Sequence, residues 1–197
     1  MPAASPDPHR RSEQSRRAIL AATVELVGDL GYEQVSIEAI ARQAGVGKQT
    51  IYRWWPSKGA VTLDALDESL DAVVDFPDTG DIVADLRTQM LGVSRLLTTR
   101  VGRVYQGLVA AAQSDPRLSR AHLDRVIEPA VLACRRRLAT GVERGELRAD
   151  IDLQGLIDLL YGVIYYRLLL HTRPLDDDQI DAVLEIAFSG ARPGRPR

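Results

Sequence analysis

The sequence lacks several residue patterns that would define other protein classes. It holds one cysteine, Cys134, which excludes an intrachain disulfide and any zinc site built from several cysteines, and which fits a reducing compartment. The longest uncharged apolar run, Leu159 to Tyr166, is far shorter than the roughly 20 residues that span a bilayer. The opening residues, MPAASPDPHRR, contain no apolar stretch typical of a signal peptide. We therefore expect a cytoplasmic protein with no membrane partner.

The chain also lacks a strong charge of either sign, since its formal net charge is −2. Residues 1–60 hold eight Lys/Arg and six Asp/Glu, a balance of +2, whereas residues 61–197 hold seventeen and twenty-one, a balance of −4. A mildly basic end on an acidic body would direct that end towards nucleic acid. Arg10, Arg11, Arg16 and Arg17 form a basic arm for which two interpretations stay open, a minor-groove contact and a solvated tail.

No segment alternates apolar and polar residues as a strand would, and almost every segment has an apolar period of 3.6 residues. The sequence thus predicts an all-α fold of about nine helices, with Ser12 and Ser36 capping the first two, Glu38 in the first turn of the second, and Pro129 kinking a long helix. Gly31, Gly145 and Pro174 would end helices, and Asp115 would cap the helix that has Pro116 at its start. The predicted helices cover 12–30, a segment after Ser36, 47–54, 57–76, 81–98, 102–113, 117–144, 152–171 and 177–189. The predicted parts are a disordered basic tail (1–11), a three-helix head (12–56), a helical body (57–190) and a disordered tail (191–197).

The most informative stretch is residues 36–58, SIEAIARQAGVGKQTIYRWWPSK. Ala41 is small where a second helix would cross the first, Gly45 can adopt the positive φ of a sharp turn, and Ile51 would fill the crossing. This spacing predicts a helix-turn-helix, in which the second helix enters the major groove of DNA. Trp55 is expected to be buried between the first and fourth helices.

The outward residues of the second helix are suited to DNA. Gln49 matches adenine, and Arg53 is the best candidate for bidentate readout of guanine. Lys48 could reach guanine or phosphate, Thr50 a phosphate or a thymine methyl, and the remaining residues the sugar-phosphate backbone. The competing interpretation is that each polar residue is merely solvated. The predicted DNA-binding residues are Ser36, Lys48, Gln49, Thr50, Tyr52, Arg53, Trp54 and Lys58.

Over about Arg16 to Leu66, this pattern resembles the TetR family of bacterial transcriptional regulators. The segment RGELRADIDLQGLIDLLYGVIYYRLLL further resembles a C-terminal subgroup of that family. The sequence departs from the usual pattern at Gly59, where glutamate is common, at Gly28, where a bulkier residue is usual, and at the pair Trp54 and Trp55. The resemblance implies a homodimer that binds a palindromic operator and is released from it by a small ligand.

A dimer is also expected because one three-helix head buries too little DNA surface for tight specific binding. The last two predicted helices are apolar around so much of their circumference that one buried face would not cover them, which favours a dimer interface. The alternative is that these residues form the core of the same chain. The predicted interface is Leu153, Leu156, Leu160, Val163, Ile164, Leu168, Ile180, Val183, Leu184, Ala187 and Phe188, with Gly155 and Gly162 allowing close approach.

An effector pocket is expected within 81–144, closed by 152–171, although ordinary core packing is the competing interpretation at every position. The predicted lining is Met90, Leu97, Tyr105, Leu108, His122, Val126, Cys134, Tyr161 and Tyr165. An enzyme is not expected, because no nucleophile–base pair, phosphate-binding glycine loop or metal-ligand spacing is present. No cofactor or metal is expected. A regulator that needs no ligand, and an activator, stay open as alternatives to a ligand-released repressor.

Overall fold

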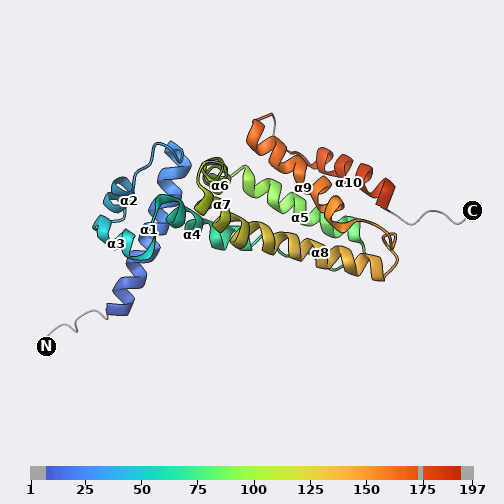
Figure 1. Cartoon of the computed structure of the whole chain (residues 1–197), viewed down its shortest axis with the longest axis horizontal. Coiled ribbons are helices and arrows are strands. Elements are labelled where there is room, and N and C mark those ends of the chain that lie inside the picture. The colour runs from blue at the N-terminus through green and yellow to red at the C-terminus, as the bar shows by residue number, and fades with distance from the viewer. Residues whose placement is uncertain (1–7, 173–174, 192–197) are drawn as a thin grey trace, which may run out of the picture. The chain divides into compact units, whose positions relative to one another are not determined.

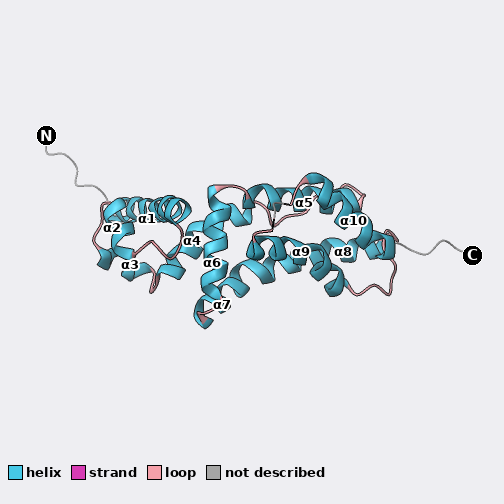
Figure 2. Ribbon diagram, turned by 90° about the horizontal axis from the view of Figure 1, so that it is seen from above, coloured by secondary structure: helices cyan, strands magenta, loops and turns pink. Residues whose placement is uncertain are grey.

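The structure, a computed structural model, describes residues 8–172 and 175–191, and Figure 1 traces its helices along the chain. Within these residues the protein is all-α, as predicted: ten α-helices and one π-helical turn, with no strand (Figure 2). The elements are α1 (Pro8–Leu30), α2 (Ile37–Gln43), α3 (Lys48–Trp54), α4 (Lys58–Asp71), α5 (Ile82–Leu97), α6 (Arg100–Ala112), α7 (Pro116–His122), η1 (Leu123–Ile127), α8 (Glu128–Glu143), α9 (Leu153–Leu170) and α10 (Asp177–Ala191).

The chain divides into two compact units. The first runs to Glu68 and also contains Thr99–Ser119, whereas the second contains Ser69–Thr98 and the residues from Arg120 onwards. Helix α4 begins in the first unit and ends in the second. The sequence assigned 102–113 to the body, but α6 belongs to the same unit as the helix-turn-helix.

Helix α6 packs closely against the region of α1, and glycines allow the close approach. A Cβ built on Gly107 would lie 2.7 Å from the Cβ of Tyr32, and one built on Gly28 would lie 2.3 Å from the Cγ of Arg100. Asp29 pairs with Arg100 at 3.0 Å, and the Arg103 Nε donates to the Gly28 carbonyl at 2.8 Å. A glycine that departs from the family pattern is thus required at residue 28 by the helix that crosses it.

Gly59, another departure from the pattern, has the same explanation. A Cβ at this position would lie 2.9 Å from both terminal methyl groups of Leu118, which is buried against the start of α4. Glutamate would be unable to occupy this position without displacing Leu118. The lost helix propensity of glycine, up to about 1 kcal/mol, is therefore offset by close packing within the first unit.

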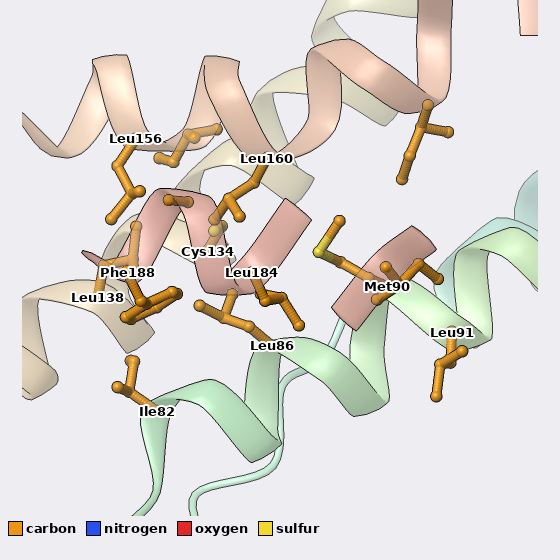
Figure 3. Packing of buried hydrophobic residues seen from close by; sticks show 14 of the residues in the cluster. Ile82, Leu86, Met90, Leu91, Cys134, Leu138, Leu156, Leu160, Leu184 and Phe188 are labelled. Carbon is orange, nitrogen blue, oxygen red and sulfur yellow. The ribbon is translucent and has the colours of Figure 1, made fainter. Parts of the chain in front are cut away.

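The second unit is built around one apolar core formed by α5, α8, α9 and α10. Figure 3 shows Cys134, Leu160 and Leu184 meeting from three of these helices. An exposed ion pair joins α5 to α10, where Arg87 donates to both carboxylate oxygens of Asp181, at 2.5 and 3.0 Å. A buried ion pair lies deeper, where the Arg137 Nε donates to Asp85 at 2.8 Å. The attraction between the two charges offsets part of the cost of removing each from water.

Several predicted helix ends are confirmed, because they depend on local chemistry. The Ser36 Oγ accepts from the Ala39 N–H, Asp115 caps α7 before Pro116, and Gly31 and Gly145 adopt positive φ where α1 and α8 end. Other ends are wrong. Ser12 lies inside α1, which begins at Pro8, so residues 8–11 of the predicted tail are helical, and α4 stops at Asp71 instead of continuing to residue 76.

The predicted helix 117–144 is divided by the π-helical turn η1. Pro129 has no N–H and cannot continue a normal helical ladder, so the backbone widens in the turn before it and α8 starts at Glu128. The predicted kink at Pro129 thus takes the form of a π turn. Pro174, expected to end the next helix, lies outside the described residues, and α9 instead ends at His171, whose φ is 52°.

In the described part of the chain, one helix, α9, is long and apolar enough to cross a membrane by length and composition. The sequence expectation rested on its uncharged run alone and overlooked the helix as a whole, which carries only Asp158 and Arg167 as charged residues. The finding is weak evidence, since core helices of soluble proteins pass the same test.

Candidate functional site

The helix-turn-helix corner is built as its sequence predicts. Gly45 has a φ of 67° and ends α2, with the Val46 N–H donating to the Ala41 carbonyl at 2.9 Å and the Gly45 N–H to the Arg42 carbonyl at 3.3 Å. This pair of bonds closes a helix in the Schellman arrangement. Ala41 and Ile51 are buried where α2 and α3 meet, so the orientation of α3 is fixed by apolar packing at its inner face.

The predicted DNA-binding residues of α3 remain on its outer face. Lys48, Gln49, Tyr52 and Arg53 are exposed, whereas Thr50 and Trp54 are half-buried. Ser36 is exposed at the start of α2, although its hydroxyl already caps that helix. The face therefore offers an ammonium, an amide, a phenol and a guanidinium, which are groups able to bind phosphates and base edges.

Two lysines of the predicted set have intramolecular partners. Lys48 pairs with Glu38 of α2 at 3.6 Å, and both side chains are exposed. A hydrogen bond from the backbone of Glu38 itself, followed by the charge of Lys48, lowers the pKa of the Glu38 carboxyl. The sequence analysis did not identify this acid as part of the face, although Glu38 was placed in the first turn of α2. A negative charge beside Lys48 must move away from a bound phosphate.

Lys58 is half-buried at the start of α4, and its ammonium donates to the Tyr32 carbonyl at 2.7 Å. The same ammonium lies 4.1 Å from the centroid of the Tyr32 ring. Burial lowers the pKa of Lys58, and burial raises the pKa of Tyr32 to about 12. Lys58 thus has a structural role in the first unit that the sequence did not indicate.

An aromatic row leads from the core of the first unit to α3. Trp55 is buried, as predicted, and its indole N–H donates to Asp64 of α4 at 2.7 Å. The ring centroids of Trp54 and Trp55 are 5.4 Å apart in an edge-on arrangement, and the Arg53 guanidinium carbon lies 5.0 Å from the centroid of the Trp54 ring. Arg16 of α1 lies over Trp55 at 5.9 Å and completes the row.

The predicted dimer residues prove largely to be core. Seven of the eleven are buried in the chain's own apolar cluster and are not available on its surface: Leu156, Leu160, Ile164, Ile180, Leu184, Ala187 and Phe188. Leu153, Val163, Leu168 and Val183 are half-buried. The prediction was wrong for the three on α9 because this helix is apolar on nearly every side, so the spacing of its apolar residues cannot indicate which side is inward. The four on α10 lie on the side of that helix that packs into the core of the same chain.

Another apolar surface lies on the same two helices, and we call it the α9–α10 stripe. Gly155 and Gly162 are exposed and lie along it, and nothing lies within 4 Å of a Cβ built on Gly162. Ile186 is 70% exposed, and contiguous exposed apolar surface of this kind marks interaction sites. The large apolar members of the stripe are Leu159, Tyr166, Leu169, Leu170 and Ile186.

The predicted pocket residues are divided between the two units. Tyr105 and Leu108 belong to the first unit, whereas the other seven belong to the second. Four of the seven, Met90, Leu97, Cys134 and Tyr161, join the apolar cluster of the second unit. His122 is buried, and burial lowers its pKa, so it favours the neutral imidazole. Val126 and Tyr165 are half-buried.

A chain of hydrogen bonds that includes Tyr161 runs through the core of the second unit. The Tyr161 hydroxyl donates to the Gln89 side-chain oxygen, and the Gln89 amide donates to the Val73 carbonyl at 2.7 Å. Cys134 lies next to Tyr161, and burial raises the pKa of its thiol to about 12. Burial also raises the pKa of Tyr161 well above its ordinary value. Gln89 was not predicted, because a single glutamine within an apolar helix carries no signal of its partners.

Comparisons with known proteins agree with this architecture. Residues 19–65 match the family described as bacterial regulatory proteins, tetR family, and residues 76–187 match the family described as tetracyclin repressor-like, C-terminal domain. The chain is 36% identical over 182 residues to the uncharacterized HTH-type transcriptional regulator YdeS of Bacillus subtilis, covering 92% of each protein. It is 32% identical over 190 residues to the DNA-binding transcriptional repressor TetR of Mycobacteroides abscessus, covering 92% of this chain and 98% of that one.

Solved structures show the same fold. The crystal structure of the TetR family transcription regulator SCO0332 has a TM-score of 0.74 and 37% identity, covering 91% of this chain and 100% of that one. The regulator FadR from Bacillus subtilis, in complex with stearoyl-CoA, has a TM-score of 0.67 at 21% identity, covering 89% and 99%. The second likeness shows the fold alone.

Proposed function

This chain belongs to the TetR family of bacterial transcriptional regulators, and from that premise we propose that it is a homodimeric repressor that binds a palindromic operator. The observation that carries the proposal is the outer face of α3, where Lys48, Gln49, Tyr52 and Arg53 are exposed on a helix fixed by the buried Ile51. The matched families and relatives are transcriptional regulators, so an enzymatic function is not proposed.

The roles of the face follow from chemistry. Arg53 reads guanine and Gln49 reads adenine, and each good bidentate pair discriminates against a wrong base by about 1–3 kcal/mol. Tyr52 and Lys58 bind the DNA backbone, with Ser36 and Thr50 beside them, and Lys48 binds a phosphate or a guanine. When Lys48 binds a phosphate or a guanine, its ion pair with Glu38 must break. Because this ion pair is exposed, breaking it costs little free energy.

The second copy of the chain covers the α9–α10 stripe. Leu159, Leu170 and Ile186 are each more than half exposed on neighbouring helices, and Gly162 leaves space for a close approach of backbones. Burying such a patch removes apolar area from water at about 25 cal/mol per Å² before the costs of association. The two recognition helices then enter successive major grooves about 34–36 Å apart.

A small molecule bound in the second unit releases the operator. Support comes from the buried polar chain of Tyr161 and Gln89, which places two hydrogen-bonding groups beside the apolar cluster of this unit. One structural neighbour, FadR, is in complex with stearoyl-CoA, a ligand with a long acyl chain, so the fold can house a ligand that is apolar in part. By linkage, an effector that weakens operator binding must itself bind more weakly, by the same factor, when operator is present. A regulator without an effector, or an activator, is the alternative.

The proposal is tested by selecting bound duplexes from a random pool with the purified full-length protein at low ionic strength. We expect a two-fold symmetric site whose half-sites lie about 10 base pairs, or a multiple of that, apart. Retention of no duplex, or of duplexes without a shared sequence, would refute specific operator binding. An inverted repeat is the result that only a symmetric pair of heads explains.

A further inference from the structure

Arg53 is an exposed side chain on the last turn of α3, and its partner is an aromatic ring. Its guanidinium carbon lies 5.0 Å from the centroid of the Trp54 ring, and within residues 8–172 and 175–191 it forms no ion pair. Lys48, by contrast, is paired with an acid, and Lys58 with a carbonyl group. Trp54 is therefore the residue in a position to restrain the Arg53 side chain.

Trp54 is in turn held by the core. Its ring meets the ring of Trp55 edge-on, with an interplanar angle of 80° and 5.4 Å between centroids. Trp55 is only 3% exposed, its backbone N–H donates to the Ile51 carbonyl at 2.9 Å, and its indole is bonded to Asp64. The row therefore connects a fixed, buried indole to an exposed cation through one intermediate ring.

The stack leaves the hydrogen-bonding capacity of Arg53 open. A guanidinium stacks through its flat face, whereas its five N–H donors lie in its plane and point outward at the edge. An ion pair with a carboxylate would occupy those donors, but an aromatic ring does not. Stacking also restrains a long side chain that would otherwise lose much of its rotamer freedom on binding DNA.

Resting on the proposed function, in which Arg53 reads a base, we propose that Trp54 is a positioning residue that holds the Arg53 guanidinium ready for one guanine in each half-site. In the sequence analysis Trp54 was instead expected to contact the DNA backbone. The two roles differ in a measurable way. A backbone contact supports binding to every sequence, whereas a positioning role acts only through Arg53 and only at the base pair that Arg53 reads.

The experiment uses the full-length protein and the operator obtained from the random pool. Dissociation constants are measured at one salt concentration for the operator and for its three variants at each base pair, with the wild type and the Arg53→Ala variant. This locates the base pair at which Arg53→Ala relaxes discrimination. The operator and its three variants at that one base pair make four duplexes. These four are then titrated with Trp54→Leu, Trp54→Phe and the double variant Arg53→Ala/Trp54→Leu.

We expect Trp54→Leu to reduce discrimination at that base pair by about two- to five-fold, the usual worth of an exposed cation–π contact. Trp54→Phe keeps a ring under the guanidinium and should retain most of the discrimination. The double variant should discriminate no worse than Arg53→Ala alone, because Trp54 acts through Arg53. The matched control is Tyr52→Leu, which removes an exposed aromatic residue of the same helix and should weaken binding to all four duplexes equally.

Each other result overturns the proposal. If Trp54→Leu weakens all four duplexes equally, Trp54 contacts the backbone directly. If the losses in the double variant add, or if Arg53→Ala relaxes no base pair, Trp54 does not act through base readout by Arg53, although operator binding stands. If the wild type selects no operator, the proposed function fails as well. Thermal melting of each variant shows whether the head is folded. If Trp54→Leu is not folded, the more conservative variant Trp54→Phe is used in its place.

Discussion

The ammonium of Lys58 donates a 2.7 Å hydrogen bond to the carbonyl of Tyr32 and lies 4.1 Å from the centroid of the same residue's ring. One side chain at the start of α4 thus holds the backbone that leads from α1 to α2. An ammonium has three donors, so two remain for a phosphate. Lys58 can stabilise the head and bind DNA at the same time.

Lys58→Ala should therefore lower both stability and operator affinity. We expect a loss of about 1–2 kcal/mol in urea unfolding, since the bond involves a charged and half-buried donor. The slope of log affinity against log salt should fall by about 0.9 for each lost phosphate contact. Lys48→Ala, whose partner Glu38 is exposed, is the control and should leave stability nearly unchanged. Unaltered unfolding of Lys58→Ala would contradict the role of Tyr32.

Gly107→Ala should destabilise the first unit by about 1–3 kcal/mol, because the added methyl group would meet the Cβ of Tyr32 at 2.7 Å and must displace backbone. The measurement is the midpoint of thermal or urea unfolding. Gly190→Ala, in α10 with nothing within 4 Å of the new Cβ, is the matched control and should be neutral or stabilising by up to about 1 kcal/mol. Equal effects of the two changes would show that α6 does not pack tightly on α1.

Ile186→Glu should convert the protein from dimer to monomer, because it places a charge at the centre of an apolar contact. Sedimentation equilibrium over a range of protein concentrations measures the change. Leu132→Glu is the control, since Leu132 is 52% exposed on α8, outside the α9–α10 stripe, and should leave the dimer intact. A wild type that is monomeric at all concentrations, or an Ile186→Glu variant that stays dimeric, would rule out this interface.

Tyr161→Phe should loosen the segment that follows α4, through the bond that Tyr161 makes to Gln89. Loss of the hydroxyl frees the Gln89 side chain, which otherwise donates to the Val73 carbonyl. Hydrogen exchange of residues 70–76, followed by mass spectrometry, should become several-fold faster. Tyr166→Phe, an exposed tyrosine of the same helix, should have no such effect. Identical exchange in both variants would mean that Gln89 holds its position without Tyr161.

Cys134 should react with thiol reagents only when the second unit opens. Burial raises the pKa of its thiol to about 12, so at pH 8 the protonated, unreactive form predominates, and the side chain is 1% exposed. Labelling followed by mass spectrometry should be slow in buffer and rapid in urea. Fast labelling of the folded protein would show that the core around Tyr161 and Met90 is open to solvent.

The sequence predicted those features that depend on neighbouring residues. Gly45, Ser36 and Asp115 end or begin helices through bonds made within a few positions, and Trp55 follows from the spacing of one turn. Pro129 correctly indicated a disturbed helix, although not that the disturbance would be a π turn. The family resemblance added the expectation of a homodimer, a palindromic operator and a releasing ligand, which local patterns do not determine.

What the sequence could not predict depends on contacts between distant elements. Gly28 and Gly107 are required by α1–α6 packing, over a separation of more than 70 residues. In α9 both sides are apolar, so the spacing could not distinguish Leu160, which is core, from Leu159, which is exposed. The stack of Arg53 on Trp54 was missed because side-chain contacts between successive residues at a helix end depend on the local backbone.

The central claim is that two copies of the α3 face read one operator together, and half-site spacing tests it most directly. The measurement is the dissociation constant of the selected operator, compared with that of the same duplex carrying five extra base pairs at its centre. We predict binding at least about 100-fold weaker for the longer duplex, because half a turn moves one half-site to the opposite side of the DNA. Equal affinity for the two duplexes would contradict the account.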